Sequence, residues 1–160
     1  MQHCFPPVTR LDTRLLLLGS LPGVMSLAAG RYYAHPRNHF WRLAGVVIER
    51  DLVSLTYEAR LEALLEAKVG LWDTVAAATR KGSLDQDIRL HEASDLAGLA
   101  AALPELKAVG FNGGKSAAIG RKALASRSDL ALVDLPSSSP AFTLPFEAKL
   151  ERWLELRRFL

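Results

Sequence analysis

Four short apolar runs constrain the fold of this chain more than any other feature. They are "RLLLLGS" (14–20), "VGLWDT" (69–74), "AVGFNG" (108–113) and "LALVDLP" (130–136). Each run is continuously apolar rather than alternating, which is typical of strands buried on both faces of a parallel sheet. The sequence therefore predicts a central four-stranded, mostly parallel sheet.

Helical patterns lie between these runs. The predicted helices cover 36–50, 55–68, 95–103, 114–125 and 146–160. Pro36 suits the first turn of the helix at 36–50, and Ser94 is a candidate cap for the helix at 95–103. The charged side chains of the helix at 146–160 are expected to face water. Strands alternating with helices predict an α/β fold, a three-layer α/β/α sandwich, and we expect one domain over residues 1–160.

Turn residues follow each predicted strand, in "GSLPG", "WDT", "FNGGKS" and "LPSSSPAF". Ligands of parallel α/β sheets bind beyond the carboxyl ends of the strands, so these loops are expected to form the site together. The turn at 19–23 matches neither GxGxxG nor a phosphate-binding P-loop, so a dinucleotide site is poorly supported. A tight strand-to-loop turn is its simpler interpretation.

Composition excludes several classes of protein. The sequence shows no signal-peptide pattern and no apolar run of about 18 residues, the length that a membrane span needs. Cys4 is the single cysteine, and no Cys/His cluster has zinc spacing. We expect a cytoplasmic protein with no metal and no cofactor.

Positive charge is unevenly distributed, although the net charge is only +3. Residues 13–48 contain four arginines and no acid, and residues 107–127 contain five basic residues and no acid. For either segment alone, a charged surface that is simply exposed to solvent explains the excess of basic residues as well as a binding face does. If the two met on one side of the molecule, they would form a phosphate-binding face.

Two asparagines are candidates for chemistry. Asn38, in "HPRNHFW", is expected in the first turn of a helix, where it would position a water or bind a polar ligand edge. Asn112 ends the third strand and carries both a donor and an acceptor, which suits the amide edge of a base. A local cap for Asn38 and a turn for Asn112 are the simpler alternatives.

Other candidates are weaker alone. Phe40 is expected either to stack on the planar ring of a ligand or to pack in the core. Lys115 is expected at the start of the helix that follows the third strand. Ser137, Ser138 and Ser139 form a turn or bind phosphate oxygens. Asp73 and Asp85 are candidate acid/base groups, with a cap or an exposed charge as the alternative.

In this order, "LLLLGSLPG", "YYAHPRNHFW", "GLWDTV", "GSLDQDI", "FNGGKSA" and "LPSSSPA" resemble the uracil-DNA glycosylase superfamily, and most closely its hypoxanthine (deoxyinosine) branch. The resemblance covers about residues 14–141. It implies the same sandwich and a base-excision repair enzyme that flips a deaminated base out of DNA. The mismatch-type and uracil-specific members carry an Asn and a His where this chain has Leu21 and Leu135.

The resemblance assigns roles to the candidates. It implies that Asn38 orients the attacking water and that Asn112 binds the base, with Phe40 or Tyr33 stacking on it and Ser20 nearby. DNA phosphates would meet the three serines, Lys115 and Arg37. The expected substrate is duplex DNA with a deaminated base, bound by a monomer. Alternatives are a uracil or mismatch glycosylase, a non-catalytic damaged-DNA-binding module, and a small nucleotide-binding protein.

Overall fold

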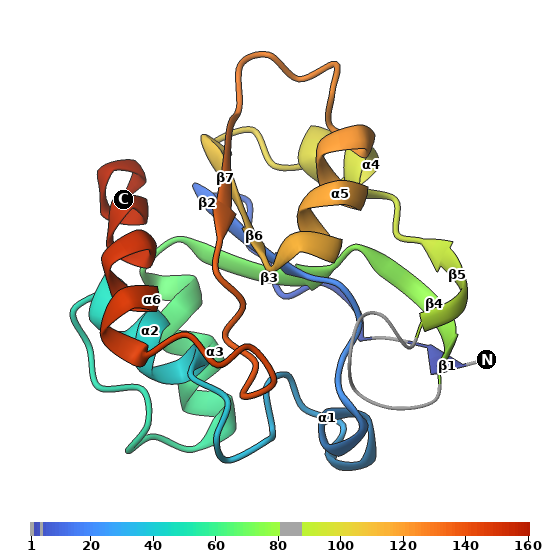
Figure 1. Cartoon of the computed structure of the whole chain (residues 1–160). Helices are drawn as coiled ribbons and strands as arrows, with labels where there is room; N and C mark the ends of the chain where they lie inside the picture. Colours follow the sequence, from blue (N-terminus) through green and yellow to red (C-terminus); the bar gives the residue numbers. More distant parts are fainter. Residues whose placement is uncertain (1, 4, 81–87) are drawn as a thin grey trace.

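A four-stranded parallel sheet forms the centre of the computed structural model, which describes residues 2, 3, 5–80 and 88–160 (Figure 1). Its strands are β2 (Leu15–Gly19), β3 (Val69–Asp73), β6 (Ala108–Asn112) and β7 (Ala131–Leu135), in the order β3-β2-β6-β7. All three neighbouring pairs are parallel, so the predicted sheet is confirmed.

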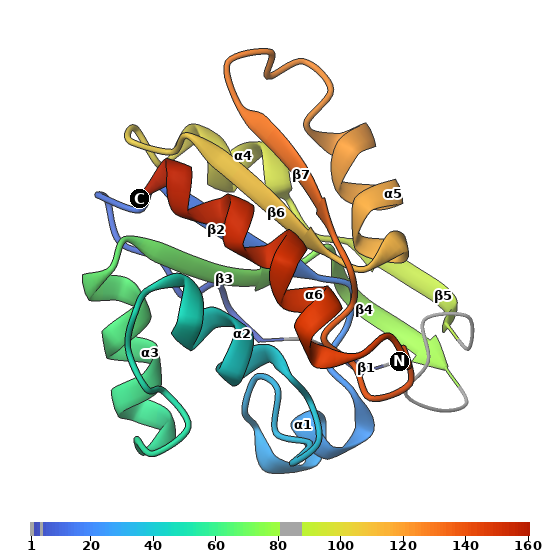
Figure 2. The same ribbon diagram turned by 60° about the vertical axis from the view of Figure 1, so that its left-hand side comes forward.

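Helices cover both faces of this sheet. On one face lie α2 (Phe40–Val47), α3 (Tyr57–Glu66) and α6 (Phe146–Trp153), which a 3₁₀ helix (Leu154–Phe159) continues; on the other lie α4 (Leu96–Ala101) and α5 (Gly114–Ala123) (Figure 2). Side chains of β2 alternate between the two layers, because successive residues of a strand point to opposite faces. Leu15 and Leu17 enter the first core, and Leu16 and Leu18 the second. The predicted α/β/α sandwich is confirmed.

Two predicted helix starts are wrong. Asp95 caps α4, since its Oδ1 accepts a hydrogen bond from Gly98 N (3.0 Å), whereas Ser94 makes no such contact. The helix expected from Pro36 begins only at Phe40. By contrast, α3 starts at Tyr57, two residues after the expected start at residue 55, with Thr56 Oγ1 accepting from Ala59 N (3.2 Å).

Two parts of the fold were not predicted. A second, antiparallel sheet has the order β1-β4-β5 and consists of β1 (Gln2–His3), β4 (Val75–Arg80) and β5 (Ile88–Ala93). A short helix, α1 (Val24–Ala29), interrupts the loop after β2. No helix in the described ranges is long and apolar enough to cross a membrane.

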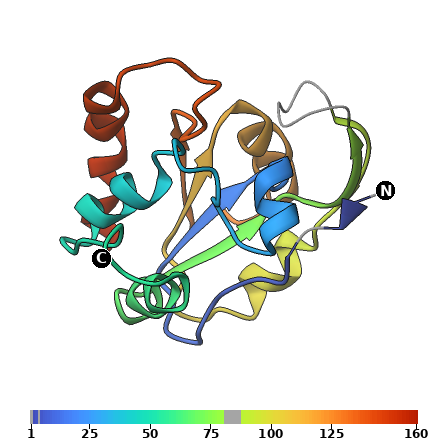
Figure 3. The ribbon, with the colours of Figure 1, turned by 90° about the horizontal axis from the view of Figure 1, so that it is seen from below.

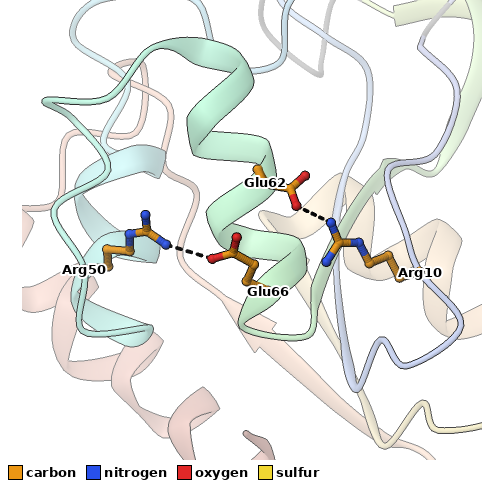
Figure 4. A network of polar contacts seen from close by, with 4 residues as sticks. All are labelled: Arg10, Arg50, Glu62 and Glu66. Carbon is orange, nitrogen blue, oxygen red and sulfur yellow. Dashed lines mark hydrogen bonds and ion pairs between the residues drawn. The ribbon is translucent and has the colours of Figure 1, made fainter.

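Ion pairs fasten the outer surface of α3 to its neighbours (Figure 4). Arg10 pairs with Glu62, and Arg50 Nη1 lies 3.1 Å from Glu66 Oε2. All four side chains are largely exposed, so each pair contributes at most about 1 kcal/mol. They tie the chain before β2 and the α2–α3 connection to one helix.

The carboxyl ends of the parallel strands meet at one edge. Gly19 is paired in register with Asp73, and Asn112 with Leu135. On this side lie α1 and the loop between β7 and α6, onto which Figure 3 looks from below. Chain segments that are far apart in sequence are therefore neighbours here.

Candidate active site

A cavity of about 510 Å³ opens at the carboxyl edge of the parallel sheet. The ends of β2, β3 and β6 and the segments after β2, β6 and β7 contribute to its wall, together with α1 and the stretch before α2. Most of the predicted site residues line it, namely Ser20, Tyr33, Asn38, Asp73, Asn112, Ser137, Ser138 and Ser139. The four loops therefore converge on one site, as their positions in the sheet predict.

Other predicted residues lie away from the cavity wall. Phe40 has no exposed surface, and neither Lys115 nor Arg37 lines the cavity. Lys115 is half-buried in the first turn of α5, while Arg37 is exposed in the turn before α2. Asp85 lies outside the described residues.

Asn38 precedes α2 instead of lying in its first turn, which corrects the prediction. Its backbone N donates to His35 O (3.0 Å) in a turn, and its Oδ1 accepts from Phe40 N (2.9 Å). His39 N donates to Ser138 O (2.9 Å), so a contact with the last loop replaces a helical bond here. The capping bond fixes the Asn38 carboxamide at the cavity wall, and its Oδ1 keeps a second lone pair.

Asn112 is bound at both ends of its carboxamide. Its Nδ2 donates to Ser138 Oγ (2.9 Å) and lies 3.4 Å from the Tyr33 hydroxyl, while its Oδ1 accepts from Ser138 N (2.9 Å). Only 8% of Asn112 is exposed. The side chain therefore holds the serine loop against β6, and the binding of a base by Asn112 stays a prediction.

Of the two aromatic residues predicted to stack on a base, Tyr33 lines the cavity and Phe40 does not. The Tyr33 ring is stacked on Phe40, with ring centroids 3.9 Å apart and an angle of 4° between the planes. Phe40 itself packs edge-on against Trp41 and Trp153 in the core. Tyr33 has φ +52°, a left-handed conformation that is uncommon for a residue other than glycine and that is often found at functional sites.

Gly19 creates room for two polar groups of the site. A Cβ at this position would lie 2.7 Å from Asp73 Oδ1 and 3.2 Å from the Tyr33 hydroxyl. Asp73 is almost completely buried. Of the described residues that line the cavity, it is the only acidic one. A glycine at the end of β2 thus allows a carboxyl group and a phenol to approach the strand.

The serine loop is ordered by its own hydroxyl groups. Ser139 N donates to Ser137 Oγ (3.1 Å), and Ala141 N donates to Ser139 Oγ (3.2 Å). With Ser138 Oγ accepting from Asn112, all three hydroxyl oxygens accept a hydrogen bond from the protein. The hydroxyl protons of Ser137 and Ser139, which are half-buried, can still be donated to a ligand oxygen, whereas Ser138 is only 1% exposed.

Lys149 contradicts the prediction that the charges of the last helix face water. It is fully buried in α6, and its Nζ donates to Ser139 O (3.2 Å) and lies 5.6 Å from the centre of the Phe142 ring. Burial lowers the pKa of Lys149, because desolvation disfavours the charged form. The contact with the serine loop explains why a lysine occupies this position.

His39 lies between the serine loop and α6. Its ring packs edge-on against Phe146 (5.4 Å between centroids), and the Arg42 guanidinium lies 3.8 Å from the centre of the same Phe146 ring. The Nδ1 atom of His39 is buried and has no hydrogen-bond partner among the residues described. Burial lowers the pKa of His39, and the positive charges of Lys149 and Arg42 lower it further, with Glu147 opposing them.

The two basic segments do not gather at the cavity. Arg14 and Lys107 lie at the opposite, amino-terminal edge of the sheet, where Lys107 N donates to Arg14 O (2.8 Å). Arg121 and Arg127 are ion-paired with Asp134 and Asp129, at 2.9 Å each. The solvated-surface alternative therefore holds for these four residues.

Several residues at the site were missed. Val24 and Met25 of α1, His35 and Phe142 all line the cavity. His35 stands in the quoted "HPRN" motif and Phe142 directly follows "LPSSSPA", so position relative to a motif could have found both. Nothing in the sequence pattern pointed to α1.

The two leucines that distinguish this chain from other branches occupy apolar surroundings. Leu21 lines the cavity and packs near Val75, while Leu135 belongs to the core on the α2 face. Neither side chain can hydrogen-bond a water. Polar chemistry at the site must come from its other residues.

Comparison with known proteins agrees with this architecture. Residues 6–157 match the family model described as "Uracil DNA glycosylase superfamily". The match spans almost the whole chain, and the chain belongs to this superfamily. It is therefore a DNA glycosylase, and its substrate is DNA.

Individual relatives are found in two species of Methanosarcina. A protein of Methanosarcina barkeri (strain Fusaro) named "Hypoxanthine DNA glycosylase" is 48% identical over 112 residues, which is 70% of this chain and 71% of that protein. A protein of Methanosarcina acetivorans with the same name is 41% identical over the same shares. The solution NMR structure of a candidate uracil DNA glycosylase from M. acetivorans superimposes with a TM-score of 0.86 at 35% identity, covering 98% of this chain and 96% of that one.

Proposed function

We propose that this chain is a monofunctional DNA glycosylase that removes deaminated bases, hypoxanthine above all, from double-stranded DNA. The main support is that Asn38, Tyr33, Asp73 and Asn112 surround one cavity although they come from four different segments. Similarity to two proteins named hypoxanthine DNA glycosylase favours this base. We expect the enzyme to act as a monomer.

The reaction breaks the bond between C1′ of the deoxyribose and N9 of hypoxanthine. The bonding pair leaves with the base, the sugar approaches an oxocarbenium ion, and a water oxygen bonds to C1′. The proton lost by the water neutralises the departing base, and an abasic site remains. The nucleotide must first leave the helix, which costs a few kcal/mol and less when it is mispaired.

Asn38 is the residue that would orient the water. Its capping bond from Phe40 N holds Oδ1 in place, and the second lone pair of Oδ1 accepts a water hydrogen. Groups already in place when charge develops need no reorganisation, and losing one costs about 3 kcal/mol in the barrier. In a dissociative reaction the attacking water does not need strong activation. A carboxamide that only orients this water is therefore sufficient.

Tyr33 would be the platform on which the extruded base stacks, with Phe40 supporting it from below. This arrangement assigns the two aromatic candidates different tasks. Base stacking on an aromatic side chain is worth about 1–3 kcal/mol. The Tyr33–Phe40 stack ties the platform to the core, so the ring has little freedom to move.

Asp73 would recognise the polar edge of the base. A carboxylate only accepts hydrogen bonds, and hypoxanthine presents an N1–H donor where adenine presents a lone pair. The N-terminus of α5, at Gly114 on the cavity wall, would stabilise negative charge on the departing ring. Ser20, beside Asp73 on the same wall, is a further candidate contact.

The serine loop would bind DNA phosphates through its hydroxyl protons. Lys115 and Arg37, outside the cavity, would meet the backbone on either side of the flipped nucleotide. Contacts of this kind are independent of sequence and weaken as salt rises.

Uracil is the alternative base, because the family description and the NMR structure refer to uracil. Leu21, on the cavity wall, argues against efficient uracil excision, since it places an apolar side chain where the mismatch-type uracil glycosylases carry an Asn. Hypoxanthine and uracil differ in ring size but share an N–H donor. The rates at which the protein releases the two bases must therefore be compared directly.

The test is base release with enzyme in excess over DNA. Duplexes containing inosine, uracil or xanthine at one position are incubated with the protein, and abasic sites are cleaved with alkali. We expect the fastest strand cleavage with inosine and none before alkali. A faster reaction with uracil would favour the alternative, and tight, salt-sensitive binding without base release would identify a non-catalytic damage-binding protein.

A further inference from the structure

We propose that buried Lys149 is the positioning residue that makes the serine loop an anion site, because it holds a loop carbonyl oxygen away from DNA and places a positive charge behind the loop hydroxyl groups. The inference rests on the proposed function, in which the hydroxyl protons of Ser137 and Ser139 bind a DNA phosphate. It assigns part of the positive charge that attracts DNA to the interior of the protein.

The carbonyl groups at the start of the loop between β7 and α6 are bound from the protein side. A phosphate oxygen and a carbonyl oxygen repel each other, so a loop that receives DNA must direct its carbonyl groups elsewhere. Three of them have protein donors: Pro136 O accepts from Trp153 Nε1 (3.0 Å), Ser138 O from His39 N (2.9 Å) and Ser139 O from Lys149 Nζ (3.2 Å). The loop is thereby left to present hydroxyl donors.

Lys149 differs from the other two donors because it carries a charge. Its side chain has no exposed surface, and the ion pairs among the described residues do not include it. Burial of an ammonium group without a carboxylate is costly. A hydrogen bond to a carbonyl group needs no charge, as the neutral indole of Trp153 shows. The contact with Ser139 O explains the donor, and an anion bound on the outer side of the loop explains its charge.

The charge of Lys149 acts beyond this one contact. Its Nζ lies 5.6 Å from the centre of the Phe142 ring on the cavity wall, and its charge lowers the pKa of His39, whose backbone N–H binds the loop. The other charged groups that act on His39 are Arg42 of α2 and Glu147 of α6. Buried charges are screened less by salt than exposed ones, so a phosphate on the loop would lie within this field.

The first experiment uses the reciprocity of binding: if the charge of Lys149 favours DNA, bound DNA must favour the charged form of Lys149. The pKa of Lys149 is measured by NMR from its Cε signal, which is identified by its absence from Lys149→Met or Lys149→Arg. The protein is titrated alone and in complex with a duplex that contains 2′-fluoro-deoxyinosine. The fluorine disfavours positive charge at C1′, so the base is not released.

In the free protein, burial lowers the pKa of Lys149. We expect this pKa to rise by about one pH unit in the complex, which corresponds to about a tenfold preference of DNA for the charged form. The His39 ring should titrate at higher pH in the complex as well, because the same phosphate acts on it. A lysine with a purely structural role would keep its pKa when DNA binds.

The second experiment separates DNA affinity from stability. Lys149→Met removes the charge, and Ser139 O keeps its hydrogen bond from Phe142 N (3.0 Å). Replacement of a buried charge by an apolar side chain is often neutral or stabilising. We therefore expect a free energy of unfolding at least equal to that of wild type, and a dissociation constant for the fluorinated duplex that is about 10-fold higher.

Arg157→Met is the matched control. Arg157 also binds main-chain carbonyl groups with a cationic side chain, through Nη2 to Val46 O (2.6 Å) and Nε to Val47 O (3.3 Å), but none of these residues lines the cavity. This variant should lose stability and bind the duplex as wild type does. The two variants are thus expected to have opposite effects on stability and affinity.

An unchanged pKa of Lys149 in the complex, or wild-type affinity in Lys149→Met, would overturn the inference. If the pKa rises but the wild-type protein releases no base from ordinary inosine DNA, the proposed function fails while the role of Lys149 stands. If hypoxanthine is released and the pKa does not rise, only the inference about Lys149 fails.

Discussion

Asn112 and Ser138 exchange two hydrogen bonds of 2.9 Å, one from Asn112 Nδ2 to Ser138 Oγ and one from Ser138 N to Asn112 Oδ1. Both residues are largely buried at the cavity wall, and the pair joins the end of β6 to the serine loop. Such a pair contributes to folding whether or not a base is bound.

Asn112→Ala is therefore expected to lower the free energy of unfolding. It leaves the buried Ser138 N–H without an acceptor, which costs about 1–3 kcal/mol. Ser138→Ala removes the acceptor 2.9 Å from Asn112 Nδ2 but keeps the bond to Asn112 Oδ1 and the Tyr33 hydroxyl 3.4 Å from Nδ2, so it should cost less, about 1 kcal/mol. Both losses in the free energy of unfolding can be measured by denaturant unfolding, provided that the dependence of this free energy on denaturant concentration has the same slope in the variants as in wild type. A variant Asn112→Ala as stable as wild type but inactive would assign Asn112 to base binding alone.

The sheet was predictable because its signal is local. Each parallel strand is buried on both faces, and a continuous apolar run such as Leu15–Gly19 records that directly. The second sheet depends on pairing between distant segments, in which Gln2 lies opposite Ala78, and β1 has only two residues. Neither feature produces a periodic pattern along the chain.

The sequence was sufficient to predict which loops form the site. It was not sufficient to predict the contacts that the residues of these loops make. The start of α2 was misplaced because His39 N bonds to Ser138 O, a partner distant in sequence. Lys149 was expected in water because charge alternates with apolar residues in α6, and a periodic pattern does not reveal a buried carbonyl partner such as Ser139 O. Tertiary contacts decided both cases.

Asn38→Ala should slow base release while preserving DNA binding. The loss of the water-orienting oxygen is expected to lower the single-turnover rate about 100-fold, and the dissociation constant for inosine DNA should change less than about 3-fold. Asn38→Asp keeps an acceptor for Phe40 N, so it should be as stable as wild type and more active than Asn38→Ala. Unchanged turnover in Asn38→Ala would exclude the water-orienting role.

Tyr33→Leu should weaken capture of the flipped base. Without the ring that stacks on Phe40, about 1–3 kcal/mol of base stacking is lost, or about 10- to 100-fold in rate at low enzyme concentration. Tyr33→Phe is the matched control, since it keeps the ring and the strained backbone and loses only the hydroxyl near Asn112. If the two variants have the same rate, stacking by Tyr33 is not required.

Asp73→Asn should reduce the preference for hypoxanthine over adenine. It exchanges a charged acceptor for an amide, and the loss of a charge-assisted hydrogen bond corresponds to about 10- to 100-fold in inosine release. Gly19→Ala, whose Cβ would lie 2.7 Å from Asp73 Oδ1, should lower the same rate by displacing the carboxyl group. Unaltered rates in Asp73→Asn would remove Asp73 from base recognition.

His39 makes the stability of the protein depend on pH. Its folded-state pKa is lowered from 6.5 by burial and by the charges of Lys149 and Arg42, so the unfolded chain binds a proton at a higher pH than the folded one. Under proton linkage, stability rises with pH wherever the unfolded state binds more protons. The contribution of His39 is therefore complete well above pH 6.5 and is lost as the pH falls through and below that value.

The measurement is denaturant unfolding between pH 7.5 and 5, together with titration of the His39 ring by NMR. We expect wild type to lose stability across this range and His39→Gln, which cannot titrate, to lose less. Lys149→Met removes one of the positive charges that lower the pKa, so the His39 resonance should titrate at higher pH in this variant than in wild type. A His39 pKa at or above 6.5 in the wild-type protein, or one that Lys149→Met leaves unmoved, would contradict this account of the contact between α6 and the residue next to Asn38.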